Sequence, residues 1–240
     1  MKGPDKQKWT RVMENDIGSL FQVIGDIKGT DACLFIHRHE VPQDSKFTYS
    51  RIVCNIIPQK KETHILRLIV GGNKLTYNDP VSIPKSDSTM AKIHWNSVLS
   101  TSDGKYLILY VKNFYLNNPM MKSEYYKITI KLIPHEIIDK YDLNNNRSYS
   151  YIYVIFEELI YGLVQAGVIT HKGLKEHLKP YGYELTRITQ GLWTHQYRDK
   201  FFTLVVDDFG ISYRNKKDAD HLISSIQEKY EVTQYCKGGL

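Results

Sequence analysis

The sequence predicts an α+β fold, in which helices cover one face of a sheet of paired strands. Short runs rich in β-branched and aromatic residues recur along the chain, and helical patterns separate them. Near the C-terminus, two helical segments flank a pair of strand-like runs, an order typical of α+β proteins. With 240 residues, 42% of them hydrophobic, the chain is long enough to bury a core in one domain or two closely packed ones.

The first predicted region, residues 1–104, contains helices at both ends and strands between them. Apolar residues recur at three- and four-residue steps over residues 9–24, which predicts an amphipathic N-terminal helix. Ser86 or Asp87 is suited to cap a second helix. The strand-like runs are residues 32–37, 49–57 and 64–70, and the last two are separated by a basic segment that indicates a hairpin loop.

The second predicted region, residues 105–240, is a sheet with helices on one face. Its expected strands are residues 105–111, 124–132, 151–156, 191–196, 201–206 and 211–213. A short helix is expected to begin near Pro134, and two longer helices are expected over residues 163–178 and 216–230. Residues 142–150 are expected to form a polar loop. From residue 105 onward the order is therefore strand, helix, paired strands, helix.

An acidic pair, Asp207 and Asp208, ends one of these strand-like runs, and its role has two interpretations. Aspartate favours turns, so the pair and the following Gly210 are suited to the bend of a β-hairpin. Two carboxylates held at a hairpin tip also offer the oxygen ligands that Mg²⁺ prefers. The dipeptide alone does not decide between a bend and a metal site.

The composition indicates which cellular compartment and which kind of binding partner suit the chain. The formal net charge of +6 and the pI near 9.0 favour an anionic partner, nucleic acid among them. The three cysteines are far apart and form no CxxC pair, which fits a reducing compartment, cytoplasmic or nuclear. The N-terminus lacks the apolar core of a signal peptide, and the charges of Glu157 and Glu158 in the most apolar stretch argue against a membrane span.

Five motifs carry a family resemblance. They are RLIVGGNKLTY at 67–77, TMAKIHWNSVLST at 89–101, VKNFYLNNPM at 111–120, YGLVQAG at 161–167, and GLWTH followed by TLVVDDFG. Each is weak alone, but in this order and spacing they resemble the reverse transcriptase domain of copia-type LTR retrotransposons, from about Trp9 to about Tyr230. The resemblance implies a polymerase right-hand fold with fingers and a ferredoxin-like βαββα palm, and it implies RNA-directed DNA synthesis on a primer–template with dNTPs.

The resemblance assigns roles to acidic and basic residues. Asp207 and Asp208 match the catalytic turn, where the family holds two Mg²⁺ ions that activate the primer hydroxyl and stabilise the leaving pyrophosphate. Arg67 matches the fingers arginine that grips the incoming triphosphate, because a guanidinium fork suits phosphate oxygens. Lys60 and Lys61 would add point charges nearby, although a solvated basic turn explains these two lysines equally well.

Two further residues match the nucleotide site of the family. Gln165 corresponds to a glutamine that contacts the nucleotide and the template, and the alternative is a helix-face glutamine that faces solvent. Tyr115 lies where the family places an aromatic ring beneath the sugar, and the alternative is a core aromatic that follows a strand.

One departure from the family pattern concerns the chemistry directly. The family places a third aspartate at the end of the strand before VKNFY, and this chain has Tyr110 there. A phenol is neutral at pH 7 and is a poor ligand for a hard cation. Asp103 lies seven residues upstream, too far along an extended strand to substitute. The sequence therefore predicts a catalytically impaired reverse transcriptase-type domain, a pseudoenzyme.

Two more departures agree with that prediction. The family usually has lysine where Val164 stands, and the chain stops at Leu240 soon after the last expected helix, so the thumb is expected to be largely missing. Other segments of a retroelement polyprotein are further possible partners. A non-catalytic nucleic-acid-binding module and a protein-interaction scaffold that keep the fold are the alternatives to an impaired polymerase domain.

Overall fold

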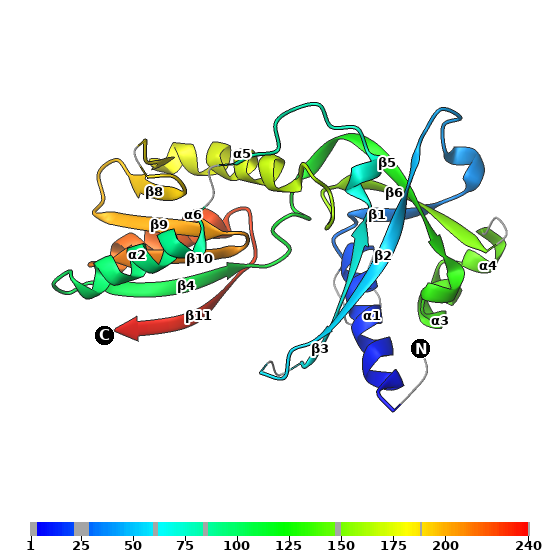
Figure 1. Ribbon diagram of the computed structural model, residues 1–240, viewed down its shortest axis with the longest axis horizontal. Coiled ribbons are helices and arrows are strands. Elements are labelled where there is room, and N and C mark those ends of the chain that lie inside the picture. The colour runs from blue at the N-terminus through cyan, green and yellow to red at the C-terminus, as the bar shows by residue number, and fades with distance from the viewer. Residues whose placement is uncertain are drawn as a thin grey trace. The chain divides into compact units, whose positions relative to one another are not determined.

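The structure is a computed structural model that describes residues 4–21, 29–59, 62–83, 86–146, 150–187 and 189–239 (Figure 1). The described residues form six α-helices and two β-sheets, which confirms the predicted α+β class. The chain divides into two compact units: unit 1 is Met1–Asp79 with Asn118–Ala166, and unit 2 is Pro80–Asn117 with Gly167–Leu240. The predicted division after residue 104 does not coincide with these units, because the chain leaves unit 2 at Asn117 and returns at Gly167.

Unit 1 contains a five-stranded sheet in the order β1-β6-β5-β2-β3. Among the described strands of this sheet, β2 and β5 form the one parallel pair. The elements are α1 (Lys6–Leu20), β1 (Cys33–Ile36), η1 (Arg38–Glu40), β2 (Phe47–Ile56), β3 (His64–Val70), η2 (Gly72–Lys74), β5 (Pro119–Thr129), η3 (Ile130–Leu132), α3 (His135–Lys140), α4 (Leu143–Asn146) and β6 (Tyr151–Glu158).

The predicted N-terminal helix and the predicted hairpin both form in unit 1. Helix α1 buries Met13, Ile17 and Leu20, as its apolar periodicity requires. It ends at Leu20, earlier than predicted, because Phe21 is already extended, and residues 22–24 of the predicted helix lie outside the described residues. Strands β2 and β3 pair antiparallel from Ser50 opposite Val70 to Ile56 opposite His64. A polar contact also fixes the helix to the sheet, because the Leu68 backbone N–H donates a hydrogen bond to Asp16 Oδ2 at 2.6 Å.

Unit 2 contains a six-stranded sheet in the order β11-β4-β10-β9-β8-β7, with every neighbouring pair antiparallel. Its elements are α2 (Ser88–Leu99), β4 (Lys105–Val111), α5 (Ala166–Leu178, whose first residue belongs to unit 1), η4 (Lys179–Tyr181), β7 (Tyr183–Leu185), β8 (Leu192–His195), β9 (Lys200–Val205), β10 (Asp208–Tyr213), α6 (Lys216–Gln227) and β11 (Val232–Gly239).

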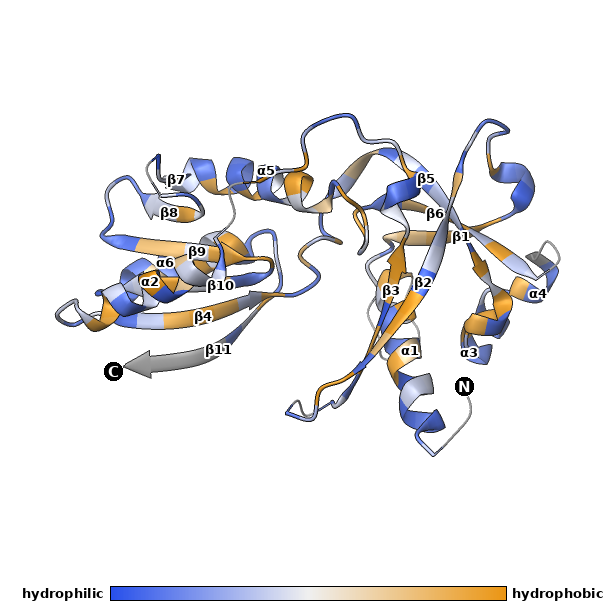
Figure 2. Ribbon diagram, in the orientation of Figure 1, coloured by the Kyte–Doolittle hydropathy of each residue, from blue (hydrophilic) through white to orange (hydrophobic). Residues whose placement is uncertain are grey.

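The core of unit 2 lies on the face of the sheet that α5 and α6 cover. Alternate residues of each central strand point into it, and Figure 2 shows the apolar stretches of β4 and β9. The buried cluster includes Leu107 and Leu109 from β4, Phe202 and Leu204 from β9, Phe209 and Ile211 from β10, Leu174 and Leu178 from α5, and Leu222 and Ile226 from α6. The prediction of helices on one face is met by α5 and α6 in unit 2. It is wrong for β5, β6 and α3, which were expected in the same sheet and belong to unit 1 instead.

Helix α2 packs on the opposite face of the same sheet. Asp87 caps it as predicted, since its carboxylate accepts a hydrogen bond from the Met90 N–H at 2.7 Å. The buried His94 lies between Thr203 and Ser212, with its Nδ1 3.3 Å from Thr203 Oγ1 and its Nε2 2.8 Å from Ser212 Oγ. Burial lowers the pKa of His94 to about 4, so this imidazole is neutral at pH 7.

Several boundaries differ from the predictions. Residues 143–146 form the short helix α4 inside the predicted polar loop. Strand β5 begins at Pro119, earlier than predicted, and gives way to η3 at Ile130. Strands β7 and β11 were not predicted, since neither has a clear apolar alternation, and pairing with a neighbouring strand defines each of them. No helix within the described ranges has both the length and the apolarity needed to cross a bilayer.

Candidate functional site: the acidic turn

The acidic turn is a tight hairpin between β9 and β10. Val205 pairs with Asp208, so Val206 and Asp207 are the two loop residues, and the predicted hairpin bend is confirmed at this position. Asp207 is half-buried and Asp208 is exposed. The Val111 N–H donates a hydrogen bond to the Asp207 carbonyl at 2.9 Å, which fixes the turn to the end of β4. Gly210, considered as part of the bend, lies within β10, where a Cβ atom would collide with the Tyr106 hydroxyl.

Val206 has a backbone conformation that β-branched residues rarely adopt. Its φ is +60°, while Asp207 does not share a positive φ, so the loop corresponds to a type II′ turn, which favours glycine at its first position. The side chain is 52% exposed and gains little from burial. Strain of this kind costs about 1–3 kcal/mol and tends to occur at functional sites.

We expect Val206→Gly to be more stable than Val206→Ala by about 1 kcal/mol, because only glycine relieves the positive φ. Both variants remove the valine side chain, so the alanine variant is the matched control. The measurement is the urea midpoint of each variant. In an unstrained strand glycine is the less stable of the two, so a higher midpoint for Val206→Ala would contradict the strained turn.

Tyr110 lies directly opposite the acidic turn. Its Cα pairs with that of Asp208 in the β4–β10 ladder, and directly paired residues direct their side chains to the same face of a sheet. That face is opposite to the buried cluster, which receives Leu109 and Val111 from the same strand. Asp103 precedes the other end of β4, where Lys105 pairs with Tyr213, so it does not approach the turn.

These residues do not fit a centre for two magnesium ions. Asp207 and Asp208 offer carboxylates, while position 110 offers a neutral phenol. Among the residues that the structure describes, no group of three or more His, Cys, Asp or Glu side chains could hold a metal ion. The donor set at this turn is therefore one carboxylate short of the set that the resemblance implies.

Tyr115 lines a cavity of about 170 Å³ in unit 2, next to the acidic turn. Val206, His171 and Trp193 also line this cavity. Tyr115 is half-buried, whereas its neighbour Phe114 belongs to the core. The structure thus brings Asp207, Asp208, Tyr110 and Tyr115 into one unit.

The other predicted nucleotide-site residues belong to unit 1 or are not described. The Arg67 guanidinium lies over the ring of Tyr161, 4.4 Å from its centroid. Gln165, directly before α5, is only 5% exposed, and its buried Oε1 has no hydrogen-bond partner among the described residues, so the solvent-facing alternative is wrong. Lys60 and Lys61 lie outside the described residues.

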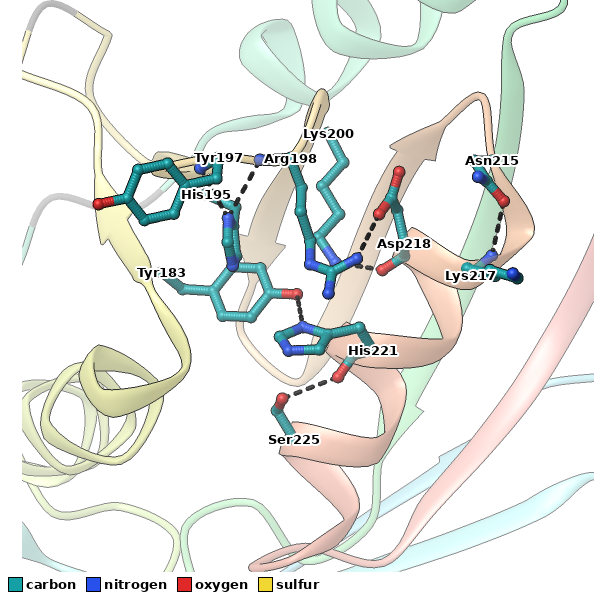
Figure 3. Close-up of polar contacts among 10 residues, drawn as sticks. All are labelled: Tyr183, His195, Tyr197, Arg198, Lys200, Asn215, Lys217, Asp218, His221 and Ser225. Carbon is teal, nitrogen blue, oxygen red and sulfur yellow. Dashed lines mark hydrogen bonds and ion pairs between the residues drawn. The ribbon is translucent and has the colours of Figure 1, made fainter.

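A buried lysine, which the sequence did not single out, holds the far end of β9 (Figure 3). Lys200 is 2% exposed, its Nζ donates to the Asp218 carbonyl, and it lies 4.8 Å from the centroid of the Tyr183 ring. Burial lowers its pKa to about 8. Arg198 Nη1 contacts Asp218 Oδ1 at 2.6 Å, so one cation from the β8–β9 connection and one from the start of β9 hold the first turn of α6.

Two histidines complete this network. His195 Nδ1 accepts hydrogen bonds from the backbone N–H groups of Tyr197 and Arg198, and Tyr183 Oη lies 2.9 Å from His221 Nδ1 (Figure 3). Burial, followed by the charges of Lys200 and Arg198, lowers the pKa of both histidines. The network anchors the hairpin that carries the acidic turn. Its members lie far apart in the sequence, so no local motif signals it.

Comparison with known proteins adds no relative, since no family model and no curated protein matches the chain.

Proposed function

We propose that the chain is a reverse transcriptase-type domain, related to those of copia-type retrotransposons, in which polymerase activity is lost or nearly lost. The observation that carries the proposal is the pairing of Tyr110 with Asp208. The pairing supports the proposed correspondence of Tyr110 with the strand position from which the family supplies its third metal-binding carboxylate.

The topology of unit 2 supports a polymerase palm. The order β4-α5-β9-β10-α6-β11 along the chain, with β11-β4-β10-β9 in the sheet, is that of a ferredoxin-like fold. The short strands β7 and β8 are inserted after α5 and extend the sheet beyond β9. In the proposed right-hand fold, unit 2 is the palm and unit 1, with Arg67 on β3, is the fingers.

The chemistry of the turn supports impairment. In the family, two Mg²⁺ ions supply the Lewis acidity for in-line phosphoryl transfer. Here Asp207 and Asp208 contribute two negative charges, and the Tyr110 phenol contributes none at pH 7. A clamp that loses one charged ligand stabilises the transition state less by several kcal/mol, which corresponds to roughly a thousandfold loss in rate.

A binding and extension experiment on the same chain tests the proposal. Fluorescence anisotropy measures the binding of an RNA–DNA primer–template to the chain. We expect the affinity to fall as the salt concentration rises, because lysine and arginine contacts to phosphates release counterions. We expect no Mg²⁺-dependent extension of the primer above background. Failure to bind at moderate salt would contradict a polymerase-derived domain, and extension at an ordinary polymerase rate would contradict the impairment.

A further inference from the structure

A large cavity in unit 1 combines basic and hydroxyl side chains. Its volume is about 630 Å³, and it lies between the loop before β2, the end of η2 and strand β5. Each of these three segments supplies one lysine and one hydroxyl residue: Lys46 and Ser45, Lys74 and Thr76, and Lys122 and Ser123. All six residues belong to unit 1, whereas the acidic turn belongs to unit 2.

The three lysines make no ion pair with the part of the chain that the structure describes. Among the described residues, none of their ammonium groups forms a salt bridge or a hydrogen bond, whereas Lys8 and Lys112 each pair with a carboxylate. Two acidic residues, Asp44 and Glu124, also line the cavity, so three cations stand against two acids. Burial raises the pKa of Glu124, although Lys122 opposes this shift. The cavity therefore has an excess of positive charge.

The backbone around the cavity is firmly held. Phe47 pairs with Tyr125 where β2 and β5 run parallel, which joins two of the three segments. Thr48 Oγ1 donates a hydrogen bond to the Gly71 carbonyl at 2.6 Å, and the Gly71 N–H donates to the Tyr49 carbonyl at 2.9 Å. These bonds join the third segment to β2. A site held in this way loses little conformational entropy when a ligand binds.

We propose that this cavity binds a small polyphosphate, meaning a molecule that carries two or more linked phosphate groups. Ammonium groups are suitable point charges for phosphate oxygens, and the hydroxyls add neutral donors. Three lysines on separate segments suit a ligand with several anionic groups better than a ligand with a single anionic group. A volume of about 630 Å³ lies within the range of roughly 300–1,000 Å³ that small-molecule sites occupy.

Isothermal titration calorimetry with inorganic triphosphate tests this site on the full chain. The test variant carries Lys46→Gln, Lys74→Gln and Lys122→Gln together. The matched control carries Lys6→Gln, Lys8→Gln and Lys131→Gln, which removes the same charge from the same unit outside the cavity. Circular dichroism checks that both variants fold.

We expect the unmodified chain to bind triphosphate, with the test variant weakened on the order of a hundredfold and the control changed by less than about threefold. Equal weakening of both variants would show general charge attraction and overturn the proposal, as would the absence of binding to the unmodified chain. A third arm uses single-stranded oligothymidylate. Oligothymidylate binding that depends on the three lysines, without triphosphate binding, would assign the cavity to nucleic acid and also overturn the proposal.

Discussion

Tyr110→Asp should give this chain Mg²⁺-dependent primer extension at a rate on the order of a thousandfold above that of the unmodified chain. Position 110 is paired with Asp208, so a carboxylate there would lie on the same face of the sheet as that of Asp208. Three carboxylates would then be available to the cations where two are available now. The measurement is single-turnover extension of a labelled primer by one nucleotide.

Two controls separate charge from shape in this experiment. Tyr110→Asn removes the phenol without adding a charge, and we expect it to stay as inactive as the unmodified chain. Adding Asp208→Asn to Tyr110→Asp should abolish the recovered extension, because it returns the number of carboxylates to two. Equal activity of the Asp and Asn variants at position 110 would contradict the role assigned to the missing charge.

Asp16→Asn should stabilise unit 1 by about 2 kcal/mol at pH 7.5 and by almost nothing near pH 4. Burial raises the pKa of Asp16 from 3.8 to about 6, against the opposing effects of the Leu68 N–H and Arg67. The folded state thus favours the protonated carboxyl, so its stabilising contribution is complete below pH 3.8 and is lost as the pH rises through about 6. An asparagine stays neutral, and its amide oxygen can still accept the Leu68 hydrogen bond.

Urea unfolding of the two proteins between pH 4 and pH 8 measures this difference. Asp139→Asn serves as the control, because it removes an exposed carboxylate from α3 in the same unit. A stability gain from Asp16→Asn that does not change with pH would show that charge burial at Asp16 is not its cause. A gain of equal size in the control would point to the net charge of the chain instead.

The sequence predicted those elements whose own residues specify them. The apolar period of α1, the Asp87 cap of α2 and the strand at residues 64–70 each appear in the structure as expected. Strand β11 was missed because β4 defines it through pairing. The two units were missed for a related reason: β5 and β6 join the sheet of the first strands through long-range contacts that no local pattern records.

The candidate site likewise contains some features that the sequence predicted and others that it did not. The position of Tyr110 beside the acidic turn followed from the motif order, and the β4–β10 register agrees with it. The strain at Val206 did not follow, because a valine in a strand-like run gives no sign of a positive φ. Lys200 was also missed, since its burial depends on Tyr183 and Asp218, residues that only the tertiary fold brings to it.

Calorimetric titration with Mn²⁺ tests most directly whether the acidic turn lacks one carboxylate, because it needs neither primer nor nucleotide. We predict that Tyr110→Asp binds Mn²⁺ at least about tenfold more tightly than Tyr110→Asn, and that adding Asp208→Asn removes the gain. Equal Mn²⁺ affinity in the Asp and Asn variants would mean that position 110 does not face the acidic pair, and it would contradict the account.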